Sequence, residues 1–389
     1  MKILFIAEVE KMLKSVSLAD WKVYLRWHMF DSYSGTLGEM FVSERFKYSG
    51  KDLVGVKKMP EMWKRGLGVV DGVMGDTLGQ AYVAKHFPPK AKKRVNELVK
   101  NVTKAYERRI QALDWMSPKT KKRAIEKLHA IQPLLGYPSK WESYRGLPVS
   151  SESHTQNILK ASLFDHKREM KKLGKPTDRK EWYMNAQTVN AYYSPNLNQI
   201  VFPAGILQPP FFYPDADDAV NYGAIGAVIG HELTHGFDDQ GALFDGVGNM
   251  KEWWSAVDKT KFTGRTKKLV DQFNLYEVED GVRVNGKLTL GENIADLGGV
   301  VISYDAFKLA QKKKKQGKID GLTAEERFFI GFAISERVAR RPELQKLIAL
   351  NDVFCSISRN FEAGKSMSEL RTTSMTAEGS SERNPMRAL

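Results

Sequence analysis

The sequence predicts an α+β fold with many helices and a few short strands. Residues 91–114 carry apolar side chains at helical spacing, which predicts one long amphipathic helix. Residues 217–235 are apolar and free of proline, and Gly236 follows them, so we expect a buried helix that ends there. Short strands are expected near residues 188–193 and 199–202.

Further helices are expected at residues 118–130, 157–173 and 324–340. Residues 147–155 are rich in Ser and contain one Pro, and we interpret them as a linker. The chain is therefore divided into a mostly helical domain at 1–153, a second domain at 154–353 and a tail at 354–389. The tail is rich in Ser, Arg, Glu, Met and Thr with little apolar periodicity, which is typical of disordered or weakly folded segments.

The segment from His231 to His235 has the spacing His-Glu-x-x-His. Residues four apart are neighbours on a helix, so both imidazoles share one face, while Glu232 projects about 100° from His231. This arrangement is typical of a zinc site in which the glutamate takes a proton from zinc-activated water. Such a motif arises by chance in a chain of this length with a probability of about 1%. The motif therefore predicts a metallopeptidase.

The residues around the motif support a helix. Asp215, Asp217 and Asp218 are acidic residues suited to a helix N-terminus, and Pro214 precedes them. Three glycines lower the helix propensity of the segment and therefore suggest close packing against another element: Gly223, Gly226 and Gly230.

A second group of acidic residues can supply the third zinc ligand and a hydrogen-bond partner for a ligating histidine. Glu292 and Asp296 are four apart on another expected helix, so they share a face. Glu292 is a candidate third zinc ligand, and Asp296 can bond the free ring nitrogen of a ligating histidine. The alternative is a solvated acidic helix face. Apolar neighbours make this alternative less favourable: Leu290, Ile294, Ala295 and Leu297.

Longer motifs resemble the neprilysin family of zinc metallopeptidases, peptidase family M13. They are residues 189–193, 199–212, 231–239 and 290–296, and the resemblance extends from about residue 7 to residue 353. The resemblance implies a thermolysin-like zincin catalytic domain with an all-α lid, one Zn²⁺ per chain, and oligopeptide substrates.

The resemblance also implies residue roles. His231, His235 and Glu292 would bind zinc, Glu232 would be the general base, and Asp296 would orient His231. Asn190 and Ala191 would lie on an edge strand and hydrogen-bond the substrate backbone. Four residues would line an apolar pocket for a large hydrophobic residue after the cut, although sequence alone favours plain core packing for them: Ile206, Phe211, Phe212 and Val228.

The sequence departs from the family pattern after Val353. The family continues with His-Ser-Pro and then Arg-Val-Asn-Gly, but Phe354-Cys355-Ser356 follows here, no His occurs after His235, and the neighbours of Arg359 do not match. A frameshift near codon 354 is one hypothesis. Two functions therefore stay open: an active zinc endopeptidase, and a zinc-binding fragment or relic with impaired catalysis. Losing one oxyanion donor costs about 10²- to 10³-fold in kcat.

The start of the chain resembles the middle of the family's lid, on the evidence of residues 21–28. We therefore expect a truncated lid, an open cleft and partly exposed lid side chains, and we consider a second chain that completes the lid.

The net charge is +14, but the basic residues are spread out and no nucleic-acid-binding motif is present. The single Cys355 rules out an internal disulfide. The absence of a signal peptide or long apolar stretch predicts a cytoplasmic product without a membrane span.

Overall fold

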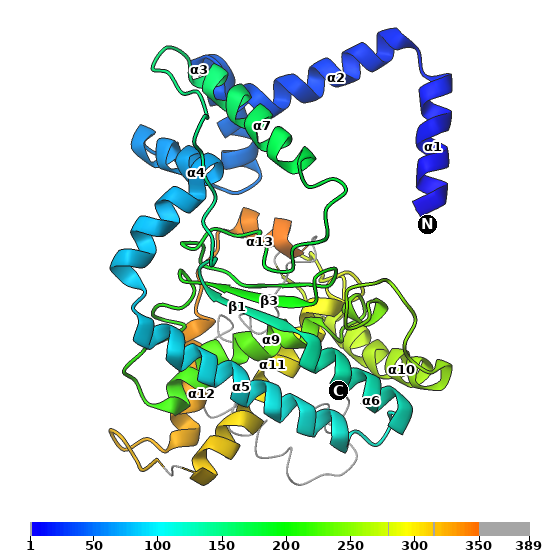
Figure 1. Ribbon diagram of the computed structural model, residues 1–389, viewed down its shortest axis with the longest axis vertical. Helices are drawn as coiled ribbons and strands as arrows, with labels where there is room; N and C mark the ends of the chain where they lie inside the picture. The colour runs from blue at the N-terminus through cyan, green and yellow to red at the C-terminus, as the bar shows by residue number, and fades with distance from the viewer. Residues whose placement is uncertain (1, 279, 314–315, 350–389) are drawn as a thin grey trace. The chain divides into compact units, whose positions relative to one another are not determined.

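The computed structural model describes residues 2–278, 280–313 and 316–349 (Figure 1). The described residues form two compact units, one made of residues 2–65 and 144–175, the other of residues 66–143 and the described residues between 176 and 349. The described residues are mostly helical and include one small sheet, in line with the many helices and few strands expected.

The first unit is helical throughout its described regular structure. Its elements are α1 (Lys2–Ser15), α2 (Leu18–Tyr33), the 3₁₀ turn η1 (Ser34–Thr36), α3 (Glu39–Arg45), the π-helical η2 (Phe46–Asp52) and α7 (His154–Met170). The Thr155 hydroxyl donates a 2.7 Å hydrogen bond to the carbonyl of Thr36, which ties α7 to η1. Helix α2 buries none of its side chains, and Trp27 is 63% exposed. Partly exposed side chains were expected for this region.

The second unit holds the sheet and the remaining helices. Helix α4 (Met62–His86) passes into it from the first unit. The other elements are α5 (Pro89–Ala112), α6 (Pro118–Ala130), β1 (Gln132–Gly136), β2 (Tyr192–Ser194), β3 (Gln199–Pro203), α8 (Asp218–Asn221), the π-helical η3 (Tyr222–Gly226), α9 (Ala227–His235), the 3₁₀ turn η4 (Gly241–Leu243), α10 (Ala256–Phe273), α11 (Leu290–Lys313), α12 (Ala324–Ser335) and α13 (Pro342–Ala349).

The three strands are ordered β1-β3-β2. Strand β1 pairs in parallel with β3, with Leu134 opposite Val201, and β2 pairs antiparallel to β3, with Tyr193 opposite Ile200. All five residues of β3 are buried, so this strand is the centre of the sheet and β2 is an edge.

The observed division of the chain differs from the predicted boundary at residue 153. Helices α5 and α6 and strand β1 belong to the unit that contains the zinc-motif helix. The physical reason is long-range pairing: β1 needs β3 as its hydrogen-bonding neighbour, and α5 packs against both α9 and α11. The linker predicted at residues 147–155 overlaps the start of α7.

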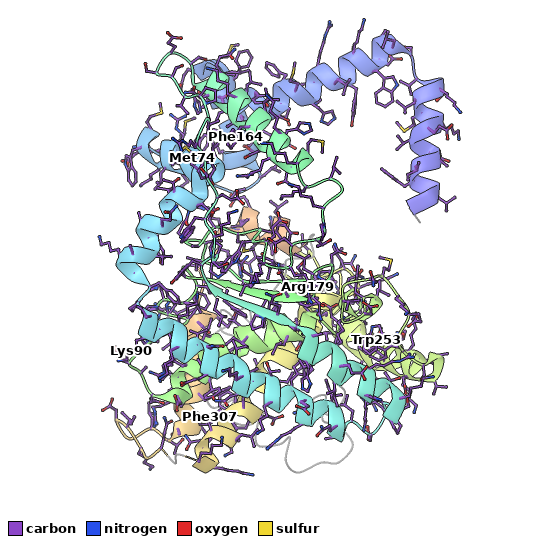
Figure 2. The ribbon with its side chains drawn as sticks, in the orientation of Figure 1. Met74, Lys90, Phe164, Arg179, Trp253 and Phe307 are labelled. Atoms are coloured by element: carbon purple, nitrogen blue, oxygen red, sulfur yellow. The ribbon has the colours of Figure 1, made fainter. Side chains whose placement is uncertain are left out.

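The predicted amphipathic helix at residues 91–114 is confirmed as α5. Its apolar stripe is buried in the core of the second unit: Val95, Leu98, Val99, Val102 and Ala105. Phe307 of α11 and Trp253 belong to the same core (Figure 2). This stripe holds α5 against the zinc-motif helices.

Two predicted helices have different ends in the structure. The helix expected at residues 324–340 ends at Ser335, and a new helix, α13, begins at Pro342. Proline disfavours the helical conformation of the residue before it, so one continuous helix does not run through Arg341 into α13. The buried helix expected at residues 217–235 is confirmed, but it contains the π-helical segment η3 between α8 and α9.

The glycines before the motif lie at close helix crossings, as predicted. A Cβ atom on Gly230 would lie 2.6 Å from the carbonyl oxygen of Gly299 on α11. One turn further along, a Cβ atom on Gly298 would lie 2.6 Å from Oγ1 of Thr234. The backbones of α9 and α11 therefore approach one another directly, and this brings the two predicted groups of site residues together.

Candidate active site

Helix α9 presents the two histidines of the motif on one face. Nε2 of His231 and Nε2 of His235 lie 2.9 Å apart, and both side chains are about four-fifths buried. The helical run that carries them begins at α8, where Asp217 accepts a hydrogen bond from the backbone N–H of Ala219. The predicted pairing of His231 and His235 is thus found in the structure.

Helix α11 supplies a carboxylate to this pair. Oε2 of Glu292 lies 3.4 Å from Nε2 of His231, and its Oε1 lies 3.7 Å from Nε2 of His235. Glu232, on α9 itself, also offers an oxygen that lies within 4.8 Å of ligand atoms of both histidines. Two carboxylates from two helices therefore face the imidazoles.

Each imidazole also has a carboxylate behind it. Nδ1 of His231 lies 2.9 Å from Oδ1 of Asp296, the contact that the family resemblance implied. Nδ1 of His235 lies 2.6 Å from Oδ2 of Asp238, which was not predicted. The only sequence signal for Asp238 was its place in the segment Gly236-Phe237-Asp238-Asp239 directly after the motif. These contacts aim both Nε2 atoms at the same point.

The three side chains fit a zinc ion. Two nitrogen ligands at about 2.0–2.1 Å from a tetrahedral zinc ion would lie about 3.3 Å apart. The Nε2–Nε2 distance of 2.9 Å and the Nε2–oxygen distances of 3.4 and 3.7 Å lie on either side of that value. Two imidazoles and one carboxylate also form a ligand set that catalytic zinc sites use.

A model of peptidase family M13 matches residues 190–378, and a second model of this family matches residues 2–138. Together the two matches cover most of the chain. The chain belongs to peptidase family M13. The match continues to residue 378, so the family resemblance runs past residue 353, where the sequence motifs alone placed its end.

Known M13 proteins resemble this chain over most of its length. It is 37% identical to human membrane metallo-endopeptidase-like 1, over 87% of this chain and 45% of that protein, and 36% identical to neprilysin-1 of Caenorhabditis elegans, over 85% and 45%. The structure superimposes on an inhibitor complex of the Mycobacterium tuberculosis zinc metalloprotease with a TM-score of 0.86 and 40% identity, over 97% of this chain and 58% of that chain. For PepO from Lactobacillus rhamnosis the TM-score is 0.78 at 32% identity, over 92% and 56%. The chain thus spans about half the length of these relatives.

The charges around the site of this M13 chain favour a cation. Burial lowers the pKa of His231, but the carboxylates of Asp296 and Glu292 outweigh burial and raise that pKa well above its usual value. Burial also lowers the pKa of His235, and the Asp238 carboxylate raises it further than burial lowers it. Burial raises the pKa of Glu232, which is only 5% exposed. The carboxylates therefore stabilise positive charge at the two imidazoles.

The residues expected to bind the substrate backbone lie just ahead of the edge strand, not on it. Strand β2 begins at Tyr192, whereas Asn190 and Ala191 precede it. Oδ1 of Asn190 accepts a 2.9 Å hydrogen bond from the backbone N–H of Ala191. The N–H of Ala191 is thus bonded to its sequence neighbour, and the strand starts later than expected.

The four residues expected to line an apolar pocket of the M13 chain differ in burial. Phe212 is fully buried and Ile206 is 4% exposed, and both belong to the main core. Phe211 and Val228 are half-buried and pack against the edge of this core. Phe211 and Val228 are therefore the two of the four that keep solvent-accessible surface.

Within the described residues, no helix combines the length and the apolar character that crossing a lipid bilayer requires. The sequence positions at which the family pattern is lost, Phe354 to Ser356 and Arg359, lie outside the described residues, as does the tail predicted at residues 354–389.

Proposed function

We propose that this chain is a zinc-dependent metalloendopeptidase that hydrolyses oligopeptides and favours large hydrophobic residues after the cut. One observation carries the proposal: His231, His235 and Glu292 converge from two helices whose backbones touch, with Asp296 and Asp238 behind the two imidazoles. The names of its relatives, which include endopeptidases and a zinc metalloprotease, support the same activity. The small sheet and the two crossing zinc helices also favour a thermolysin-like zincin domain of the α+β class.

His231, His235 and Glu292 would hold one zinc ion. Zinc bound in such a site is a Lewis acid that polarises the scissile carbonyl and makes water a better nucleophile. Glu292 suits the ligand role because its two oxygens face one ring nitrogen each. Glu232 suits another role, because it stands on the same helix between the two histidines and is almost completely buried.

Glu232 is the general base of the proposed reaction. Its carboxylate accepts a proton from the water molecule while the water oxygen bonds to the carbonyl carbon. It then gives that proton to the nitrogen of the leaving amine as the peptide C–N bond breaks. General acid–base catalysis of this kind contributes about 10²- to 10⁴-fold to the rate.

Asp296 and Asp238 are positioning residues. Each accepts a hydrogen bond from Nδ1–H of one histidine, which fixes the tautomer with a free Nε2 lone pair and makes that nitrogen a better ligand. Neither aspartate is required to touch the substrate.

The substrate would bind along the free edge of β2 by adding a strand to the sheet, with Asn190 and Ala191 as backbone partners. Phe211 and Val228 would line the pocket for the residue after the cut, and Ile206 and Phe212 would support them from the core. Large apolar side chains suit a pocket of this composition because their burial is favourable.

An alternative is a zinc-binding chain with impaired catalysis. The observation that favours it is the sequence, which has no histidine after His235 where the family places one that steadies the transition state. Loss of one such donor lowers kcat by about 10²- to 10³-fold and leaves the metal site intact.

Hydrolysis of a quenched fluorescent peptide library by zinc-loaded protein tests both proposals, with Glu232→Gln as the matched variant. The first proposal expects cleavage before Phe, Leu or Ile that a chelator stops and Glu232→Gln abolishes. Stoichiometric zinc with no turnover above that of Glu232→Gln would refute it and support the impaired alternative.

A further inference from the structure

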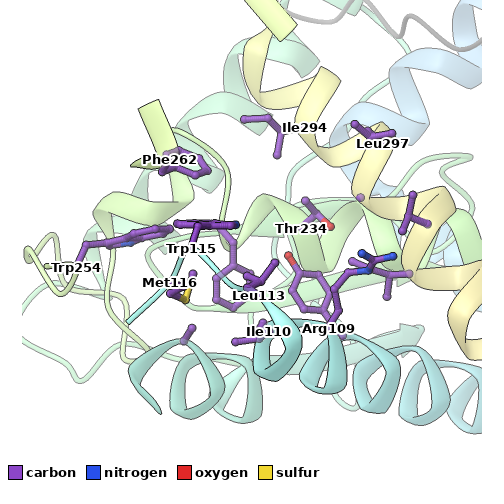
Figure 3. A pocket seen from close by; sticks show the side chains of 16 residues that line it. Arg109, Ile110, Leu113, Trp115, Met116, Thr234, Trp254, Phe262, Ile294 and Leu297 are labelled. Atoms are coloured by element: carbon purple, nitrogen blue, oxygen red, sulfur yellow. The ribbon is translucent and has the colours of Figure 1, made fainter. Parts of the chain in front are cut away.

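A cavity of about 70 Å³ lies in the second unit beside the crossing of the two zinc helices (Figure 3). Thr234 of α9 and Ile294, Leu297 and Gly298 of α11 form one wall, and residues of α5, α6, α10 and the loops between helices form the others. On α11 these wall residues occupy the side of the helix away from Glu292 and Asp296. No side chain of the metal site lines this cavity, so it is separate from the proposed active site.

The lining of the cavity is almost wholly apolar and aromatic. Trp115 and Trp254 stack with ring centroids 6.0 Å apart, and Phe262 packs against Trp254 at 5.2 Å. Ile110 and Ala124 close the cavity from α5 and α6 and are almost fully buried. Apolar cavities of this kind stay dry and bind small apolar groups.

A basic groove of about 630 Å³ adjoins this cavity. Arg109 of α5 and Leu113, the residue after that helix, line both hollows, so the two hollows adjoin at these side chains. Arg109 donates from Nε to Oδ2 of Asp305 at 3.1 Å, and its two terminal nitrogens have no partner among the described residues.

Two other cations in the groove have no ion-pair partner among the described residues. Arg108 and Lys312 both line it, and neither forms an ion pair with a described residue. Lys308 is paired with Glu325 at 2.8 Å, and Asp114 lies 3.7 Å from Arg265. The groove therefore has an excess of positive charge next to an apolar hole.

We propose that the cavity and the groove together bind a small amphipathic carboxylate, such as a medium-chain fatty acid. The end of the hydrocarbon chain enters the cavity between Ile110 and Trp115, and the carboxylate stays in the groove at Arg109. Because about 150 Å³ accommodates a benzene ring, a cavity of half this volume takes only the last few carbons of a chain. Guanidinium groups bind carboxylates through two parallel hydrogen bonds, which matches the two open nitrogens of Arg109.

Isothermal titration of the full chain with sodium octanoate tests the proposal without reference to peptidase activity. We expect one-to-one binding, with affinity that falls up to about fourfold for each methylene removed on going to hexanoate. Arg109→Gln should weaken octanoate binding at least tenfold. Lys104→Gln, which removes an exposed charge from the same helix outside both hollows, should leave binding unchanged.

Several results would overturn the proposal. If octan-1-ol bound as tightly as octanoate, or if the wild type and Arg109→Gln had equal affinity, the carboxylate would not bind in the groove. If affinity did not depend on chain length, the hydrocarbon tail would not bind in the cavity. The place of the tail is tested further by Ala124→Leu, which should fill the cavity and abolish binding.

Ala124 is fully buried, so this variant can also impair folding. A crystal of the unaltered protein with 8-bromooctanoate supplies the second measurement. An anomalous bromine peak between Ile110 and Trp115 would support the proposal, and a peak elsewhere on the protein would refute it.

Discussion

Oδ2 of Asp238 lies 2.6 Å from Nδ1 of His235, which repeats at the second histidine the contact of 2.9 Å between Asp296 and His231. The two aspartates come from different elements, one from the loop after α9 and the other from α11. An aspartate beside Nδ1 favours the tautomer in which Nε2 keeps its lone pair, which is the form that a metal ligand needs.

Asp238→Asn should lower zinc affinity by about 10- to 100-fold, because an amide is a weaker acceptor for Nδ1–H and leaves Nε2 less basic. Competition with a chromogenic chelator would measure this change. Asp239→Asn is the control: it removes the same charge one residue further on, where the carboxylate bonds Gln240 and no histidine. Equal zinc affinity of the two variants would contradict the role of Asp238.

The close crossing of α9 and α11 gives a second prediction. Gly230→Ala should destabilise the protein by about 1–3 kcal/mol, because the new Cβ atom would lie 2.6 Å from the carbonyl oxygen of Gly299 and the backbones cannot separate without loss of packing. Urea unfolding of the two proteins would measure the difference in the free energy of unfolding.

Gly264→Ala is the control for this crossing. Gly264 lies in the middle of α10, where a Cβ atom would have no neighbouring atom within 4 Å, so the same substitution should stabilise that helix by about 0.5–1 kcal/mol. Destabilisation of equal size at both glycines would show that the crossing is not the cause.

The sequence predicted the elements that have a local pattern. Helix α5 has its apolar stripe, and the pair Glu292 and Asp296 shows its spacing of four, so these helices were predicted. The same spacing led us to expect a contact of Asp296 with a ligating histidine, and the family resemblance implied that this histidine is His231. The contact of Asp238 with His235 was not predicted, because it depends on a turn beyond the helix end that carries no periodic pattern.

The division into units could not be predicted for a related reason. Strand β1 pairs with β3, with Leu134 opposite Val201, and this pairing joins segments that are distant in the sequence. Nothing near residue 134 indicates which later segment it pairs with. The buried Lys127 is another such case, because its partners lie in a loop more than a hundred residues later.

The N-termini of α6 and α10 meet at one carboxylate. Oδ2 of Asp258 accepts hydrogen bonds from the hydroxyls of Thr120 at 2.6 Å and Ser255 at 2.7 Å, and the Ser117 hydroxyl donates to the same oxygen. Burial alone would raise the pKa of Asp258, but these hydrogen bonds outweigh it and lower the pKa to about 2.

This carboxylate predicts a pH dependence of stability. The folded pKa lies below the usual value of 3.8, so the ionised group contributes about 2 kcal/mol above pH 4, and this contribution is lost as the pH falls through 2. The stability difference between the wild type and Asp258→Asn should therefore shrink as the pH falls from 6 to 2.5 in urea unfolding. Asp271→Asn, on the exposed part of the same helix, should show no such trend; a difference for Asp258→Asn that is constant with pH would contradict the assignment.

Lys127 of α6 fixes the loop that follows the zinc-motif helix. The residue is 2% exposed, and its Nζ donates hydrogen bonds of 2.7 Å to the carbonyls of Gly241 and Phe244. The N–H of Gly241 in turn donates to Oδ1 of Asp238, the partner of His235. Two hydrogen bonds, one from Lys127 to Gly241 and one from Gly241 to Asp238, therefore connect the lysine to the aspartate that contacts His235.

Lys127→Met keeps the length and apolar stem of the side chain but leaves two buried carbonyls without a donor, so it should cost about 2–4 kcal/mol of stability. Because the loop then loses its anchor, zinc affinity should fall as well, although Lys127 touches no proposed ligand. Urea unfolding and chelator competition would measure the two effects. Lys122→Met, an exposed position on the same helix, should change neither quantity. If Lys127→Met lost stability but kept wild-type zinc affinity, the lysine would support the fold alone, and the order of the Asp238 loop would have to come from its own backbone hydrogen bonds.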